Sequence, residues 1–129
     1  MKYICLAYEE ERHLNGLSRE EWTELRAETL SYLEVLRERG HILSAEALQS
    51  SRTAATVRVR AGKLSVTDGP FAETKEQLGG FFLIEARDLN EAIQVASKWP
   101  SARFGSIEVR PIETELRTEN RYGPAAAPP

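Results

Sequence analysis

The sequence predicts an α+β fold of the ferredoxin-like type, a split βαβ arrangement with an inserted hairpin. Two observations predict it. Strand-like apolar runs alternate with two segments of helical periodicity, in the order strand, helix, strand and again strand, helix, strand. Between these halves lie two short alternating runs that fit a hairpin. Two βαβ units in tandem build one antiparallel sheet, and right-handed crossovers place both helices on the same face.

Each predicted helix begins at a residue that can cap its first turn. Ser18 precedes the first helix and Glu21 follows in the capping-box pattern, while Gly40 is the expected stop. Asp88 caps the second helix, which Pro100 should end. Helical spacing predicts that the second helix buries an inner face made of Ala92, Ile93, Val95, Ala96 and Trp99.

Strands are predicted where β-forming residues run together or alternate with polar ones. The runs in the sheet fall at residues 3–8, 41–48, 80–86 and 106–112. Those in the hairpin fall at residues 56–60 and 64–67, joined by the loop Ala61-Gly62-Lys63. The acidic and polar segment 9–16 is expected to be a loop.

Two of the predicted strands are apolar on both faces, although two helices on one side can cover only one face. The alternating sets are Tyr3, Cys5 and Ala7 against Ile4, Leu6 and Tyr8, and Phe81 and Leu83 against Phe82 and Ile84. An exposed apolar face usually marks an interface. We therefore expect a homodimer whose two sheets pack face to face.

Composition argues against several classes of function. The 129 residues carry 17 Lys and Arg against 20 Asp and Glu, a formal net charge of −3, so no nucleic-acid partner is expected. The single cysteine, Cys5, can form neither an internal disulfide nor a zinc site alone. No apolar run approaches the ~18 residues of a membrane span, and the acidic residues after the first strand do not fit a signal peptide. We expect a cytoplasmic protein with no membrane partner.

The predicted elements all fall in one domain, residues 1–113. Residues 114–129 end in a stretch rich in Pro and Ala, a composition that does not pack. We therefore predict a folded domain over residues 1–113 and a mobile C-terminal tail over residues 114–129.

The most distinctive stretch runs from Asp68 to Gly80 and reads DGPFAETKEQLGG. Together with the opening strand, the hairpin and the closing strand, it resembles the signature of the DGPF subgroup of the YCII-related family, over about residues 1–113. The resemblance implies a dimeric α+β barrel. It also implies that some relatives are enzymes of ring dehalogenation with a His-Asp pair, and that others are encoded beside extracytoplasmic-function sigma factors.

The same stretch supplies most of the candidate site residues. Asp68 is the candidate base at the rim of a small-molecule pocket, and His41 is a second catalytic candidate, although the first helix lacks the histidine that the relatives carry there. The alternative interpretation is a plain turn with Phe71 in the core and the charges in water. No metal site and no cofactor are predicted. The ligand-binding candidates are Arg58, Gly69, Pro70, Phe71, Lys75 and Tyr32.

Two functions from different classes fit these features. The first is an acid–base enzyme of the lyase or isomerase type, without a cofactor, that acts on a small organic molecule in each subunit of a homodimer. In it Asp68 would be the base, and Arg58 or Lys75 would offer charge to an anionic substrate. The alternative is a non-catalytic binding or regulatory module, linked to sigma factors as in some relatives.

Overall fold

The computed structural model describes residues 1–116 and 120–122. Most of the predicted tail, residues 114–129, lies outside the described residues, and its described part forms neither helix nor strand. No helix of the described residues is both long and apolar enough to cross a membrane. The elements follow in the order β1 (Lys2–Glu9), α1 (Glu11–Asn15), α2 (Arg19–Glu38), β2 (Ile42–Ala47), β3 (Ala55–Arg60), β4 (Lys63–Asp68), β5 (Gln77–Glu85), α3 (Leu89–Ser97) and β6 (Ser106–Pro111), with short 3₁₀ turns at Ser51–Thr53 and Pro100–Arg103.

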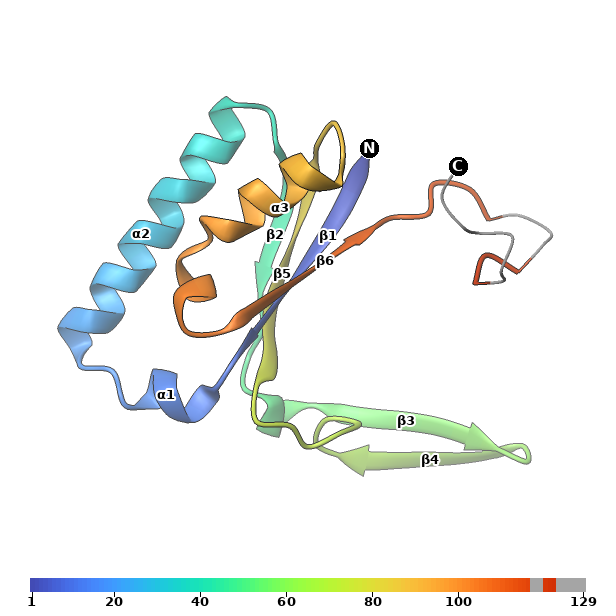
Figure 1. The fold of residues 1–129 in the computed structure, drawn as a ribbon. Helices are drawn as coiled ribbons and strands as arrows, with labels where there is room; N and C mark the ends of the chain where they lie inside the picture. Colours follow the sequence, from blue (N-terminus) through green and yellow to red (C-terminus); the bar gives the residue numbers. More distant parts are fainter. Residues whose placement is uncertain (117–119, 123–129) are drawn as a thin grey trace.

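Four strands form the main sheet in the order β2-β5-β1-β6, and each neighbouring pair is antiparallel. This is the order that two βαβ units produce when they share one sheet, so the predicted ferredoxin-like α+β fold is confirmed. The helices α2 and α3 lie on one face of this sheet (Figure 1). The strands β3 and β4 pair in a separate hairpin that projects away from it (Figure 1).

Both predicted helix starts are confirmed. The Ser18 hydroxyl accepts a hydrogen bond from the Glu21 backbone N–H at 3.1 Å, and the Glu21 carboxylate accepts one from the Ser18 N–H at 2.9 Å. This reciprocal pair satisfies two donors that the first turn of α2 would otherwise leave open. At α3, the Asp88 carboxylate accepts from the Glu91 N–H at 2.9 Å.

Two predictions about helices were wrong. Residues 11–15, expected in a loop, form α1, because the Gln77 side-chain oxygen accepts the Glu11 N–H and holds its first turn through a contact distant in sequence. The second error concerns α3, which ends at Ser97. Because a residue before proline avoids the helical conformation, Trp99 lies beyond the helix, and Ile93 is half-exposed rather than part of the inner face.

The hairpin turn is tighter than predicted. Lys63 pairs with Arg60 in the ladder, so the loop consists of Ala61 and Gly62 alone. Both residues have positive φ, 51° and 75°. A two-residue loop of type I′ requires this conformation, and its twist matches that of the two strands it joins.

The core lies between the helices and the inner face of the main sheet. Phe82 is fully buried and stacks on Trp99 with 4.1 Å between the ring centroids. Tyr32 packs edge-on against Trp99 and donates its hydroxyl to the Val95 carbonyl oxygen at 2.6 Å. Cys5 is buried in the same layer, and burial raises the pKa of its thiol to about 12. The aromatic cluster therefore joins α2, β5 and the chain just after α3.

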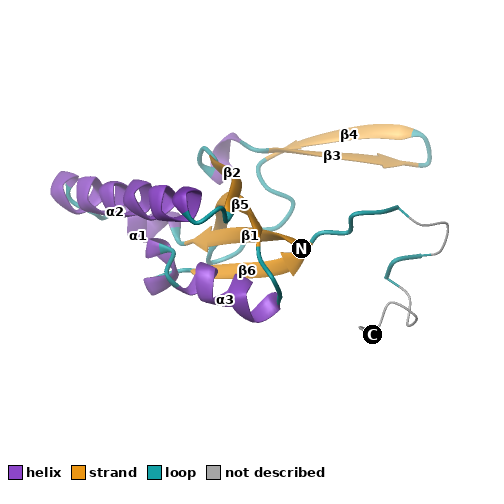
Figure 2. Ribbon diagram, turned by 90° about the horizontal axis from the view of Figure 1, so that it is seen from above, coloured by secondary structure: helices purple, strands orange, loops and turns teal. Residues whose placement is uncertain are grey.

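The opposite face of the main sheet carries no helix (Figure 2). We call it the open face, and its side chains alternate with those of the core along β1 and β5. They are apolar and only partly buried: Ile4, Leu6, Tyr8, Phe81 and Leu83. Both faces of β1 and β5 are thus apolar, as the sequence pattern indicates. The helices cover only the inner face.

Replacing Phe82 by Ala should lower the free energy of unfolding by about 3–5 kcal/mol, because the change removes a buried ring and leaves a void under Trp99. Urea unfolding followed by circular dichroism measures the loss. The matched truncation is Leu89→Ala at a half-exposed position, which should cost at most about 1 kcal/mol. Equal losses in the two variants would show that Phe82 is not central to the core.

Candidate functional site

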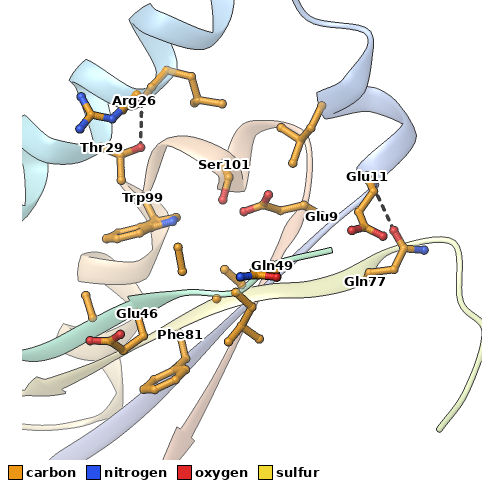
Figure 3. A pocket seen from close by; sticks show the side chains of 18 of the residues that line it. Glu9, Glu11, Arg26, Thr29, Glu46, Gln49, Gln77, Phe81, Trp99 and Ser101 are labelled. Atoms are coloured by element: carbon orange, nitrogen blue, oxygen red, sulfur yellow. Dashed lines mark hydrogen bonds between the residues drawn. The ribbon is translucent and has the colours of Figure 1, made fainter. Parts of the chain in front are cut away.

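A cavity of about 410 Å³ lies between α2 and the inner face of the main sheet (Figure 3). The strands beneath α2 contribute small residues to its lining, namely Ala7, Ala45, Gly79 and Gly80. The helix contributes larger ones, namely Trp22, Leu25, Thr29 and Leu33. The remaining border includes Glu9, Trp99 and Ser101.

The cavity exists because the strands opposite α2 carry little side-chain volume. Gly80 is required by the close approach of two strands, since a Cβ there would lie 2.7 Å from the Glu46 carbonyl oxygen of β2. Trp22 and Leu30 of α2 stay half-exposed at the cavity. A concave, mostly apolar space with a few polar groups is the usual form of a small-molecule site.

Glu9 is the titratable group that this cavity perturbs most clearly. It follows Ala7 by two positions on β1 and therefore shares the inner face. Its carboxylate lies over Gly79, where a Cβ would come within 3.2 Å of Oε2. Burial raises the pKa of Glu9 above its ordinary value, and the nearby Ser101 hydroxyl opposes this shift in part. The carboxyl group is thus poised to hold a proton at a higher pH than an exposed glutamate.

Ser101 lies beside this carboxyl group. The residue is 5% exposed, and its buried Oγ has no well-formed hydrogen bond among the described residues. Figure 3 shows Ser101 and Glu9 pointing toward one another across the cavity border. Because an unsatisfied buried hydroxyl is costly, a polar atom of a bound molecule would be stabilised here.

Glu11, two residues further on, also lines the cavity but has the opposite electrostatics. Its carboxylate accepts hydrogen bonds from the Ser51 backbone N–H at 3.0 Å and from the Ser51 hydroxyl at 2.6 Å. These bonds stabilise the charged form and lower the pKa of Glu11. Two carboxyl groups whose surroundings drive their pKa values apart are characteristic of acid–base sites. Here Glu9 favours keeping a proton and Glu11 favours losing one.

The comparisons with known proteins agree with this fold. The chain matches the YCII-related domain over residues 1–115. The chain belongs to the YCII-related family. An uncharacterized protein of Rhizobium meliloti (strain 1021) is 39% identical over 114 residues, which cover 87% of this chain and 92% of that relative.

A solved structure shares the fold of this YCII-related chain. It is 5-chloro-2-hydroxyhydroquinone dehydrochlorinase from Burkholderia phenoliruptrix AC1100, in complex with 2,5-dihydroxybenzoquinone. The TM-score is 0.52 at 16% sequence identity, and the match covers 88% of this chain and 94% of that one. At this identity the likeness concerns the fold alone.

The Asp68-Gly69-Pro70-Phe71 motif of this YCII-related chain lies at the base of the hairpin, and none of its residues lines the cavity under α2. Asp68 is exposed at the end of β4, and Phe71 is 81% exposed in the loop that follows. The cavity therefore does not lie at this motif, where the sequence predicts a pocket. The alternative interpretation, which places Phe71 in the core, was wrong, and a pocket at the motif stays a prediction.

The other predicted site residues are spread over the fold. His41 directly precedes β2, and its Nδ1 lies 2.8 Å from the Glu85 carbonyl oxygen at the end of β5. Arg58 lies on β3, and Lys75 lies in the loop before β5. Tyr32 faces α3 through its hydrogen bond and does not line the cavity. In the single chain, none of these four predicted site residues lines the cavity.

Sequence reasoning missed Glu9, Ser101 and both tryptophans as site residues. The acidic run predicts a loop that begins at Glu9, whereas β1 extends through this residue. One signal was available for Glu9. It continues the alternating series Tyr3, Cys5 and Ala7, which predicts that its side chain faces inward. Within residues 1–116 and 120–122, no group of three or more His, Cys, Asp or Glu side chains is arranged to hold a metal ion.

Glu9→Gln should flatten the dependence of stability on pH. Because the folded state raises the pKa of Glu9 above the ordinary value of 4.5, it holds the proton more tightly than the unfolded chain. The resulting contribution to stability is complete below that value and is lost as the pH rises through the folded-state pKa. Urea unfolding from about pH 4 to about pH 8 should show this fall in the wild type and not in the variant.

The control for this measurement is Glu113→Gln, which removes one carboxylate from an exposed position outside the cavity. Its stability profile should keep the slope of the wild type. If Glu9→Gln keeps that slope as well, the carboxyl group of Glu9 is not desolvated at the cavity.

Proposed function

We propose that this YCII-related protein is an acid–base enzyme that acts on a small hydroxylated ring compound in the cavity under α2. The observation that carries the proposal is the half-buried Glu9, with its raised pKa, at the border of an apolar cavity. A carboxyl group is an efficient proton-transfer catalyst when its pKa approaches the working pH. The proposed step needs no cofactor.

The lining of the cavity supports a flat ring as the ligand. Trp22 and Trp99 both border the space, and aromatic side chains favour offset-stacked or edge-on contacts with other rings. The unsatisfied Ser101 hydroxyl offers a hydrogen bond to a ring oxygen. Glu9 lies beside Ser101 in Figure 3, so a ring oxygen held by Ser101 would also lie close to the Glu9 carboxyl group.

A lyase step shows how the two carboxylates would divide the work. The ionised Glu9 takes a proton from the substrate, the electrons of the broken bond form a new double bond, and the leaving group departs with its bonding pair. Raising the pKa of Glu9 makes its carboxylate a stronger base. Glu11, which also lines the cavity, stays ionised through its bonds to Ser51.

The dehydrochlorinase that shares the fold gives this reaction class independent support. Its name describes the loss of chloride from a hydroxylated ring, and a dihydroxybenzoquinone is bound in its structure. The long Asp68–Gly80 stretch further leads us to propose that the chain falls in the DGPF subgroup of its family. A cytoplasmic location stays a prediction.

The test is chloride release from 5-chloro-2-hydroxyhydroquinone. The wild type should catalyse it, and Glu9→Gln should lower kcat by at least about 100-fold, because the general base is lost. The matched control is Glu113→Gln, which should leave kcat unchanged. A Glu9→Gln variant as active as the wild type would overturn the role of Glu9.

Binding is measured separately through tryptophan fluorescence, since both tryptophans of the chain border the cavity. The probe is 2,5-dihydroxybenzoquinone, which should quench the wild type saturably and Ala45→Leu much less, because the larger side chain occupies cavity volume. Saturable quenching without turnover of the chlorinated substrate would favour the alternative, a non-catalytic binding or regulatory module. Quenching that does not saturate would remove the cavity as the site.

We further propose that two copies pair through their open faces. A sheet with one apolar face in water is unfavourable, and a second copy offers the same apolar surface in return. Sedimentation equilibrium at micromolar concentration should give twice the chain mass of 14.5 kDa. A species of 14.5 kDa would contradict the homodimer and leave the proposal for Glu9 standing.

A further inference from the structure

We infer that the hairpin β3–β4, residues 55–68, is an arm that packs its apolar face on a second copy of the chain. This inference rests on the proposed homodimer. It assigns a role to four exposed apolar side chains of the arm: Val57, Val59, Leu64 and Val66. None of them lines the cavity under α2.

One face of the arm is apolar from Val57 to its tip, with Asp68 on the same face at the base. Val57 lies opposite Val66, and Val59 lies opposite Leu64, so the four side chains form two neighbouring cross-strand pairs. Their exposed fractions lie between 58% and 68%, and no described part of the same chain covers them. A lone two-stranded hairpin is at best marginally stable in water, so this face needs a covering surface.

The opposite face of the arm is polar. Thr56 lies opposite Thr67, Arg58 opposite Ser65, and Arg60 opposite Lys63. A ribbon with apolar residues on one side and hydroxyl and basic groups on the other is built for burial on one side only. Solvent therefore suits the polar side, and a protein surface suits the apolar side.

The direction of the arm indicates that this surface belongs to a second copy. In Figures 1 and 2 the arm extends from the β2 side of the main sheet away from α2 and α3, on the side of the open face. A copy that packs on the open face therefore enters the space beside the arm. The open face alone supplies five partly buried apolar side chains, and the four of the arm bring the apolar surface nearer to the ~800 Å² per partner of a stable interface.

Two hydrogen bonds join the base of the arm to the turn after β4. The Gly69 N–H donates to the Ala54 carbonyl oxygen at 2.7 Å, and the Thr56 hydroxyl donates to the Gly69 carbonyl oxygen at 2.8 Å. Gly69 has φ of +100°, a conformation that a side chain would strain. The Asp68-Gly69-Pro70-Phe71 motif thus sets the angle at which the arm leaves the domain.

The test compares two neighbouring positions on opposite faces of β4. Leu64→Asp places a charge on the apolar face, whereas Ser65→Asp places the same charge on the polar face. Both side chains are exposed in the single chain, so neither change disturbs the core. In sedimentation equilibrium Leu64→Asp should raise the dimer Kd at least tenfold, and Ser65→Asp should leave it within about twofold of the wild type.

A second measurement on the wild type guards against local misfolding of the variant. Hydrogen exchange of residues 55–68 should slow as the protein concentration rises through the dimer Kd, because the arm becomes covered. A wild-type dimer that Leu64→Asp does not weaken, with exchange independent of concentration, would overturn the arm and leave the open-face dimer intact. A monomeric wild type would overturn both and point to a different protein as the cover, while the fluorescence test of the cavity would still stand.

Discussion

The stacking of Trp99 on Phe82 is the contact on which the rest of the structure depends. This contact holds the chain just after α3 against the centre of β5. The centroids of the two rings lie 4.1 Å apart. The same short segment carries Ser101 to the cavity and Arg103 to Glu28 of α2, with which it forms two hydrogen bonds at 2.9 and 3.1 Å. One aromatic pair, with Phe82 fully and Trp99 partly buried, thus positions the end of α3, steadies α2 and completes the cavity border.

The sequence predicts the fold well because the fold follows from local patterns. Ser18 and Asp88 mark the helix starts through side-chain chemistry that acts within one turn, and strand alternation marks the sheet. The two errors have different causes. The helix α1 depends on Gln77, which is far away in sequence. The helix α3 ends before Trp99 because this residue precedes Pro100, and the Trp99 ring then stacks on Phe82 from outside the helix.

The candidate site was harder to predict, because it results from missing volume rather than from a motif. Small residues on three strands leave space under α2, and no single one of them suggests a ligand. The conspicuous motif at Asp68 lies at the base of an exposed hairpin instead. In the functions that we propose, the distinctive stretch shapes assembly, and an ordinary glutamate at the end of a strand carries the chemistry.

The position of Cys5 has a consequence for how the molecule tolerates its surroundings. It is the one cysteine of the chain, fully buried at the centre of β1, with a thiol pKa of about 12. The thiolate is the form of cysteine that reacts with oxidants and alkylating reagents. Because the pKa of Cys5 is so high, very little of its thiol is in this form at neutral pH. The thiol of the folded protein is therefore slow to react, and a cysteine introduced on the surface would react well before Cys5 does.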